Sequence, residues 1–135
     1  DEAIGARYFD TLEEMLPQCA FVSLHMPSAG SPVMTPERLD LLPRGAILVN
    51  TARGDLIDEE ALLAALATGQ VGAAGLDVFR GEPAFDLRFK DFPNVFLTPH
   101  MGSATIETRN AMGWRALDNL ARFIEGGHPP DAINY

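Results

Sequence analysis

Four short, continuously apolar runs set the strongest limit on how this chain can fold. They are FVSLHM (21–26), AILVN (46–50), VGAAGLDVF (71–79) and VFLT (95–98). Segments with helical signals separate them. Strands that are apolar along their whole length are typical of a parallel sheet that is covered on both faces. We therefore predict an α/β fold built on a parallel sheet.

The segments between these runs carry helix start and stop signals. Thr35-Pro36-Glu37 combines an N-cap, a proline at the first helical position and an acid in the first turn. Asp58 precedes EEALLAALAT, and this pattern ends at Gly69. A T-x-x-E capping box that starts at Thr11 predicts another short helix.

Two further segments lie near the ends of the chain. ARYF (6–9) is a possible short strand. The longest helical pattern runs from about Ala104 to Ile124, with Met112, Ala116 and Leu120 on the same face as Ile124. This helix breaks the rhythm of short elements, so we expect it to pack outside the core of the domain.

Charge and cysteine content narrow the classes of function. The 135 residues carry a formal net charge of −9, with scattered arginines and a single lysine, Lys90. This argues against binding to nucleic acid, which needs a basic face. No apolar run approaches the ~18 residues that span a membrane, and the start, DEAIGARY, is unlike a secretory signal. We expect a cytoplasmic protein in which the only cysteine, Cys19, is a buried packing residue.

Polar residues follow each of the four apolar runs. In an open parallel sheet the carboxyl ends of the strands share one edge, and ligands bind there. That edge would gather His25 and Pro27 after the first run, Asn50-Thr51-Ala52-Arg53 after the second, Asp77 and Glu82 after the third, and Thr98-Pro99-His100 with Gly102 after the fourth. Because these residues share one edge, the set indicates a ligand-binding site more specifically than any single residue does.

Three of these residue types together suggest a chemistry. His100 is the natural proton carrier because an unperturbed imidazole titrates near neutral pH. A carboxylate beside it, from Glu82 or Asp77, would orient the ring and favour its protonated form. Arg53 offers a planar fork for a carboxylate or carbonyl. This combination suits the reduction of a carbonyl that lies next to a carboxylate.

Taken singly, each candidate also has a purely structural interpretation, and these alternatives stay open. They are a backbone-bonding loop histidine for His100, carbonyl capping or pairing with an acid such as Asp55 for Arg53, solvation for Glu82, turn capping for Asp77, and packing or backbone bonding for His25.

Longer motifs carry a resemblance to a known family. The stretches VSLHMP, GAILVNTARGDLIDEEAL, GLDVFRGEP and NVFLTPHMGSATIETRNAM cover nearly the whole chain. In their order and spacing they resemble the D-isomer-specific 2-hydroxyacid dehydrogenases, especially the glyoxylate/hydroxypyruvate reductase branch. The resemblance implies a Rossmann-like doubly wound sheet with a long C-terminal helix. It also implies hydride transfer between NAD or NADP and a small 2-oxo or 2-hydroxy acid, no metal, and a homodimer as the full-length protein.

The resemblance also implies roles for individual residues. The arginine of TARG, Arg53, would bind the substrate carboxylate and carbonyl. His100 would be the acid/base, and Glu82 would pair with it. The residues that would contact or border the cofactor are Thr51, Ala52, Arg53, Asp77, His100, Met101, Gly102, His25 and Pro27.

The glycine-rich phosphate-binding turn of this family is not found in the sequence. GQVGAAG (69–75) lies where a helix leads into a strand, the reverse of the order that a fingerprint requires, so we assign it to packing. We therefore expect residues 1–103 to form a partial NAD(P)-binding domain without its first βα unit. Residues 104–135 would be a helix and tail that return toward a missing substrate domain. A nicotinamide-sensing, corepressor-like binding module and an inactive fragment are the alternatives.

Overall fold

The computed structural model describes residues 5–28 and 30–133. The chain folds into two compact units, which meet in the sequence between His100 and Met101. The first unit contains α1 (Leu12–Met15), η2 (Leu16–Gln18), β1 (Phe21–Leu24), α2 (Pro36–Asp40), β2 (Ala46–Asn50), η3 (Gly54–Leu56), α3 (Glu59–Thr68), β3 (Val71–Leu76), η4 (Leu87–Asp91) and β4 (Val95–Leu97). The second unit contains α4 (Ile106–Ile124).

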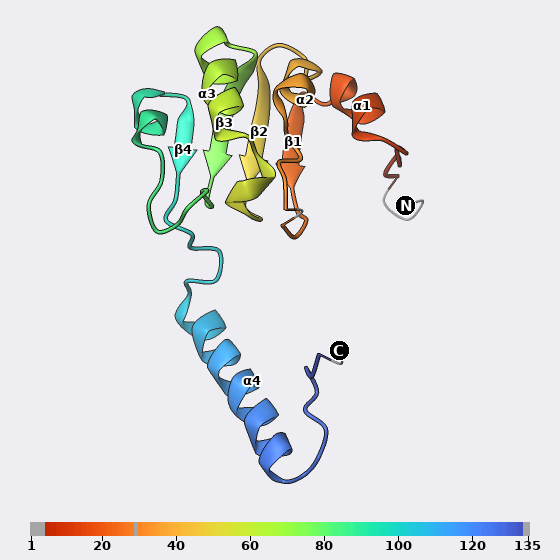
Figure 1. Cartoon of the computed structure of the whole chain (residues 1–135), viewed down its shortest axis with the longest axis vertical. Coiled ribbons are helices and arrows are strands. Elements are labelled where there is room, and N and C mark those ends of the chain that lie inside the picture. Colours follow the sequence, from red (N-terminus) through yellow and green to blue (C-terminus); the bar gives the residue numbers. More distant parts are fainter. Residues whose placement is uncertain (1–4, 29, 134–135) are drawn as a thin grey trace. The chain divides into compact units, whose positions relative to one another are not determined.

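The strands form one parallel sheet in the order β1-β2-β3-β4 (Figure 1). This is the sequential order of one half of a doubly wound sheet, so the predicted α/β fold is confirmed. The register pairs Leu24 with Asn50, Asn50 with Leu76, and Leu76 with Leu97. All four strands therefore end on the same row, and their carboxyl ends share one edge.

Three helices begin at the caps that the sequence predicted, whereas α2 ends at Asp40, before the expected stop near Pro43. The side chains of Thr11, Thr35 and Asp58 each accept a hydrogen bond from the backbone N–H three residues on, and Thr105 does the same for α4. Helix α3 stops at Gly69, whose φ of 73° lies in the left-handed region. Local capping therefore fixes the lengths of the segments that return the chain to the sheet.

The core of the first unit lies on one face of the sheet. Inward-facing strand residues pack with the buried side of α3 and with α2 in a single cluster that includes Leu24, Leu48, Leu62, Leu66 and Leu76. On the opposite face Phe21, Ile47 and Phe96 are exposed. Within the described ranges, coverage of both faces is thus wrong. Sequential right-handed crossovers place their helices on the same side of a sheet.

Two predictions near the N-terminus need correction. Residues 6–9 form no strand in the described chain. There Arg7 bonds the Gln18 side chain and lies over the ring of Phe9 instead. A strand needs a paired neighbour to satisfy its backbone groups, and this run does not pair with β1. Cys19 does pack against the core, but it is only partly buried.

Helix α4 buries none of its residues. Its large apolar side chains, among them Trp114, Leu117 and Phe123, are exposed. Within the second unit, Arg115 forms two 2.6 Å hydrogen bonds with Asp131, which hold the following tail against the helix. The Arg115 guanidinium lowers the pKa of the Asp131 carboxyl to about 2. In the part of the chain that is described, no helix meets the length and apolarity that crossing a membrane requires.

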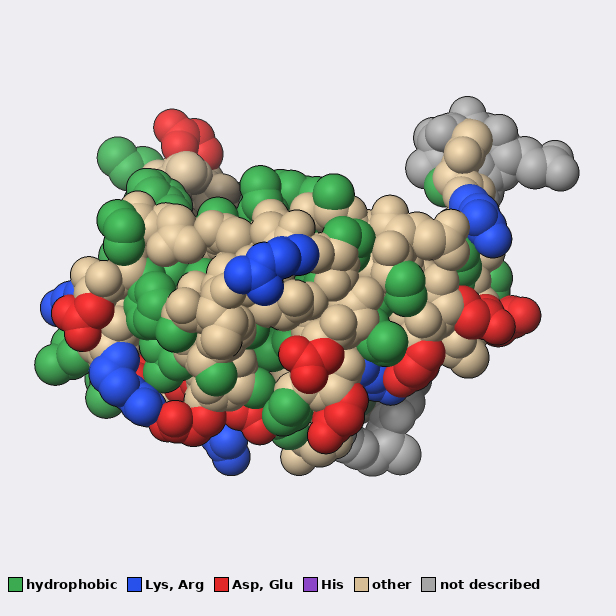
Figure 2. All heavy atoms as spheres, turned by 90° about the horizontal axis from the view of Figure 1, so that it is seen from above, with side chains coloured by type: hydrophobic (Ala, Val, Ile, Leu, Met, Phe, Trp, Pro, Cys, Tyr) green, Lys and Arg blue, Asp and Glu red, His purple; other side chains and the backbone are tan. Residues whose placement is uncertain are grey.

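Charged side chains of both signs are dispersed over the face that Figure 2 shows. On the face that Figure 2 shows, acidic side chains and the fewer basic ones are interspersed, and the described residues form no continuous basic area there. The net negative charge of the chain, −9, is therefore not offset by a positively charged area on this face. A polyanion would meet no cationic track on it.

Two glycines of β3 give a matched test of the packing. A Cβ at Gly72 would lie 2.5 Å from the carbonyl oxygen of Gly45, whereas one at Gly75 would meet Val49 at 3.6 Å, an ordinary contact. We expect Gly72→Ala to lower the free energy of unfolding by about 1–3 kcal/mol. Gly75→Ala should leave it unchanged or raise it by up to about 1 kcal/mol. Urea unfolding measures both, and equal effects would contradict the close approach.

Candidate functional site

The carboxyl edge of the sheet carries the predicted site residues. His25, Thr51, Asp77 and Thr98 each follow directly the strand residue that lies on the shared terminal row. The parallel register therefore brings side chains from four separate stretches of sequence to one edge, as parallel sheets do at their ligand sites.

Asn50 organises the turn that carries Arg53. This residue is buried at 1% exposure, at the end of β2. Its Nδ2 donates to the carbonyl oxygen of Arg53 at 2.8 Å, and its Oδ1 accepts from the backbone N–H of Ala52 at 3.1 Å. Sequence reasoning placed Asn50 at the edge but gave it no role. The available signal was an amide side chain at the end of an otherwise apolar run.

Arg53 leaves this turn with an exposed side chain. Its Nη1 donates to the carbonyl oxygen of Ala52 at 2.6 Å, so the carbonyl-capping interpretation holds for one N–H. Pairing with Asp55 is not what the structure shows, because Asp55 accepts a short hydrogen bond from the Ser28 hydroxyl. A guanidinium has several further N–H donors, and these can receive a ligand carboxylate.

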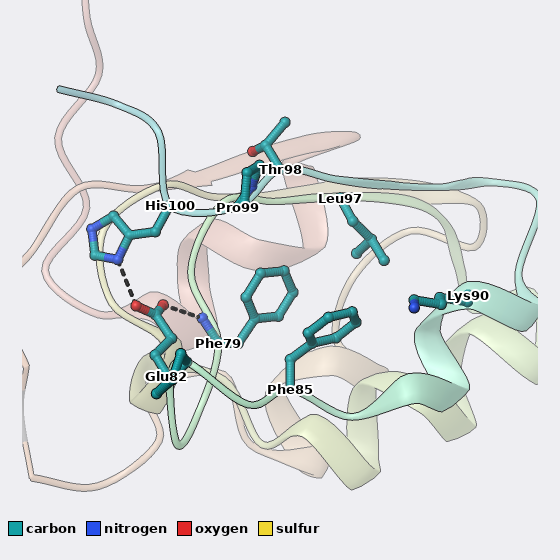
Figure 3. Close-up of a pocket in the computed structure, with 9 residues that line it drawn as sticks. Phe79, Glu82, Phe85, Lys90, Leu97, Thr98, Pro99 and His100 are labelled. Atoms are coloured by element: carbon teal, nitrogen blue, oxygen red, sulfur yellow. Dashed lines mark hydrogen bonds and ion pairs between the residues drawn. The ribbon is translucent and has the colours of Figure 1, made fainter. Parts of the chain in front are cut away.

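Glu82 and His100 form a direct pair (Figure 3). The Nδ1 atom of His100 lies 2.6 Å from Oε2 of Glu82, and Oε1 of Glu82 accepts from the backbone N–H of Phe79 at 2.8 Å. The carboxylate thus bridges the loop after β3 and the end of β4. His100 has a φ of 51°, in the left-handed region that non-glycine residues seldom occupy. In this structure the two side chains bond each other, and both remain exposed to solvent.

These contacts set the charge of Glu82. The hydrogen bond from the His100 ring, followed by that from the Phe79 amide, lowers the pKa of the Glu82 carboxyl below its ordinary value. Glu82 is therefore ionised at neutral pH, and its carboxylate orients the ring of His100 through Nδ1.

Asp77, the other candidate partner for His100, has a different contact. It is buried, and its Oδ1 accepts from the hydroxyl of Thr98 at 2.5 Å. This bond joins the ends of β3 and β4. Thr98 therefore helps to hold Asp77 in place, a contact that the sequence analysis did not predict. The available signal was a hydroxyl side chain directly after an apolar strand.

A hollow brings the three predicted catalytic residues together. Arg53, Glu82 and His100 all line a depression of about 230 Å³, along with backbone of the Phe79–Gly81 turn. Glu82 and His100 also line a larger hollow of about 620 Å³, whose wall contains Phe79, Phe85 and Lys90 (Figure 3). A cation, a proton carrier and an orienting carboxylate thus face one small space.

The remaining predicted cofactor residues are more dispersed. His25 and Pro27 are exposed after β1, and Nε2 of His25 lies 2.8 Å from the hydroxyl of Ser23. This contact is neither the packing nor the backbone bond considered for His25. Thr51 is exposed and Ala52 is half-buried. Met101 and Gly102 belong to the second unit, and roles of all these residues in cofactor binding stay predictions.

Metal-ligating side chains do not gather in the described ranges. Residues 5–28 and 30–133 contain no group of three or more histidine, cysteine, aspartate or glutamate residues that could hold a metal ion.

Fold and site together define a class of protein. Parallel strands whose carboxyl ends share one edge are typical of nucleotide-binding α/β domains, and here that edge carries a His–Glu pair and an arginine that line one hollow. Residues 1–102 match the family model described as "D-isomer specific 2-hydroxyacid dehydrogenase, NAD binding domain". The chain belongs to the D-isomer-specific 2-hydroxyacid dehydrogenase family.

Individual relatives agree with this assignment. Over 99% of this chain, the sequence is 43% identical to glyoxylate reductase of Pyrococcus furiosus, of which it covers 40%. A crystal structure of a D-isomer specific 2-hydroxyacid dehydrogenase from Polaromonas superposes with a TM-score of 0.92 at 40% identity, covering 97% of this chain and 42% of that one. The NADPH-dependent glyoxylate/hydroxypyruvate reductase of Sinorhizobium meliloti, solved with NADP and malonate, gives 0.91 at 35%, covering 98% and 42%. The chain spans about two fifths of the length of these proteins.

The Glu82–His100 bond has a measurable electrostatic consequence. We expect His100→Ala to raise the pKa of the Glu82 carboxyl toward its ordinary value, because the largest cause of its lowering is removed. A ¹³C NMR titration of the glutamate carboxyls measures this. His25→Ala is the matched control, since His25 contacts Ser23 and not Glu82.

The sign of the linked stability effect follows from the same shift. The pKa of Glu82 is lower in the folded than in the unfolded chain, so the bond stabilises the fold above the ordinary glutamate range. This stabilisation is lost as the pH falls through the lowered pKa. An unchanged Glu82 titration in His100→Ala would contradict the pairing.

Proposed function

We propose that this chain provides the acid/base and substrate-clamping groups of an oxidoreductase. The enzyme would transfer a hydride between NAD(P)H and a small 2-oxo or 2-hydroxy acid, with glyoxylate or hydroxypyruvate as the favoured substrate. The observation that carries the proposal is the hollow that Arg53, Glu82 and His100 line together. The family and the activities for which its relatives are named support it.

Each residue has a defined task in this reaction. The guanidinium of Arg53 binds the carboxylate of the acid in two hydrogen bonds and so fixes the neighbouring carbonyl. His100 donates a proton to the carbonyl oxygen during reduction and accepts it back during oxidation. Glu82 holds the His100 ring through Nδ1, which leaves Nε2 for the substrate. A positioned acid of this kind contributes roughly 10²–10⁴-fold in rate.

The cofactor, NAD or NADP, supplies the hydride when it is bound. The carboxyl edge fits the nicotinamide half, because the buried Asp77 carboxylate and the polar turn at Thr51 and Ala52 lie at the ends of adjacent strands. His25 and Pro27, after β1, would lie along its other half. The sequence contains no G-x-G-x-x-G turn, so we assign no residue of this chain to the pyrophosphate.

The same proposal covers the division of the chain, its location, its assembly and its relation to nucleic acid. Residues 1–103 would act as the second half of an NAD(P)-binding domain, and residues 104–135 as the helix and tail that return toward a substrate domain. The full-length protein would be a cytoplasmic homodimer that does not bind nucleic acid. The family resemblance supports the dimer, and sedimentation velocity on the full-length protein would test it.

Turnover by the full-length protein is the direct test. Steady oxidation of NADH or NADPH in the presence of glyoxylate or hydroxypyruvate is the expected result. Binding of the nicotinamide cofactor without turnover of any 2-oxo acid would contradict the enzyme and favour a nicotinamide-sensing binding module.

Two alanine variants of the full-length protein should change different kinetic constants. We expect His100→Ala to lower kcat by about 10²–10⁴-fold with nearly unchanged cofactor affinity, because only proton transfer is lost. Arg53→Ala should mainly raise KM for the acid, with an additional loss of kcat if the arginine also polarises the carbonyl. Steady-state kinetics and fluorescence titration of the cofactor measure both. Similar kinetic changes in the two variants would contradict the separate roles.

A further inference from the structure

The peptide unit between Phe79 and Arg80 lies against Gly54, which follows Arg53, and belongs to the turn from which Glu82 extends. A Cβ at Gly54 would stand 2.1 Å from the carbonyl carbon of Phe79 and 2.5 Å from the backbone nitrogen of Arg80. No side chain fits between these backbones. The residue directly after Arg53 therefore touches the turn from which Glu82 extends.

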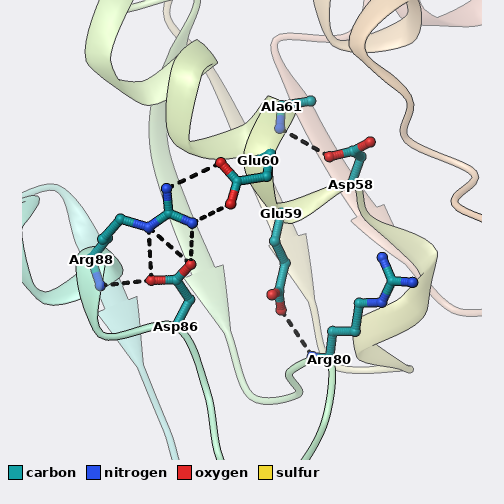
Figure 4. Close-up of polar contacts among 7 residues, drawn as sticks. All are labelled: Asp58, Glu59, Glu60, Ala61, Arg80, Asp86 and Arg88. Carbon is teal, nitrogen blue, oxygen red and sulfur yellow. Dashed lines mark hydrogen bonds and ion pairs between the residues drawn. The ribbon is translucent and has the colours of Figure 1, made fainter.

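Two carboxylates hold the consecutive amides of this turn. The N–H of Phe79 donates to Oε1 of Glu82, and the N–H of Arg80 donates to Oε1 of Glu59, each at 2.8 Å (Figures 3 and 4). The first of these bonds orients Glu82 toward His100. The second joins the same turn to the start of α3. Displacement of the Arg80 amide would therefore move the anchor of Glu82.

Glu59 is not needed as the cap of its helix. Asp58 already accepts from the backbone N–H of Ala61 at 3.0 Å and caps α3 (Figure 4). Glu59 is the first residue of α3 and points to the loop instead. Burial raises the pKa of the Glu59 carboxyl, the charges of Asp86 and Glu60 act in the same direction, and the Arg80 amide and side chain oppose them. The Glu59 carboxylate is thus partly desolvated, which costs free energy unless it is hydrogen-bonded, and the Arg80 amide supplies that hydrogen bond.

We propose that Glu59 is a positioning residue for proton transfer: it fixes the Arg80 amide and thereby the turn from which Glu82 holds His100. This inference rests on the proposed function, since it assigns Glu59 to the same site. Glu59 does not itself reach the hollow that Arg53 and His100 line. Its effect passes through backbone, from Arg80 to Phe79 to Glu82.

The neighbouring Glu60 provides a matched control. Its carboxylate bonds the Arg88 guanidinium, which also binds Asp86 (Figure 4). This cluster joins the later part of the loop to α3, and the side chains of Glu60 and Arg88 are 74% and 54% exposed. Exposed ion pairs of this kind contribute little to stability. Removal of Glu60 deletes the same side chain one residue away without touching the Arg80 amide.

The test compares Glu59→Ala, Glu59→Gln and Glu60→Ala in the full-length protein. We expect Glu59→Ala to lower kcat by about 10–100-fold, because a small displacement of a catalytic group has that effect. Glu59→Gln should retain most of the activity, since its amide oxygen can still accept from Arg80. Glu60→Ala should behave as the wild type. Loss of kcat to the same extent in Gln and Ala would overturn the inference, as would wild-type kcat in Glu59→Ala.

A second readout does not depend on turnover. In Glu59→Ala the pKa of the Glu82 carboxyl, followed by ¹³C NMR, should rise toward its ordinary value, and in Glu59→Gln it should stay lowered. If the wild type shows no turnover but Glu82 responds in this way, the proposed function fails and the positioning role stands. If the wild type turns over but the Glu82 titration is the same in all variants, the positioning role is overturned.

Discussion

The register of the parallel sheet is the constraint on which the site depends. Leu24, Asn50, Leu76 and Leu97 lie on one row, so the chain leaves all four strands at the same level. A shift of one strand by a single residue would turn its side chains to the other face. The core on one face of the sheet fixes this register, because buried residues of β1, β2 and β3 belong to one hydrophobic cluster with residues of α2 and α3. Hydrophobic packing thus determines where the polar residues of the edge can stand.

Close backbone packing then brings Arg53, the proposed substrate clamp, to Glu82 and His100, the proposed proton-transfer pair. Arg53 and Glu82 are separated by the whole of α3 and β3 in the sequence. Gly54 lets the turn after β3 approach the turn after β2, and the Phe79 amide aims Glu82 at His100.

Much of this arrangement could be predicted from local sequence signals. Caps at Thr35 and Asp58 and the stop at Gly69 depend on neighbouring residues alone, and all three appear in the structure. The contacts of Thr98 with Asp77 and of Glu59 with the Arg80 amide could not be predicted, because each joins segments that only the folded sheet brings together. Coverage of the sheet also failed as a prediction. Apolar strands show that a face is suited to burial, but Phe21 and Phe96 are exposed among the described residues.

The bond between the Glu82 carboxylate and His100 is the central claim, and one measurement tests it most directly. The pH dependence of 2-oxo acid reduction should be compared between the full-length wild type and Glu82→Gln. A glutamine can keep a hydrogen bond to His100 but carries no charge to favour the protonated ring. The pair predicts that reduction by Glu82→Gln declines at a lower pH than reduction by the wild type. Superimposable profiles would show that the negative charge of Glu82 does not act on His100, and would contradict the claim.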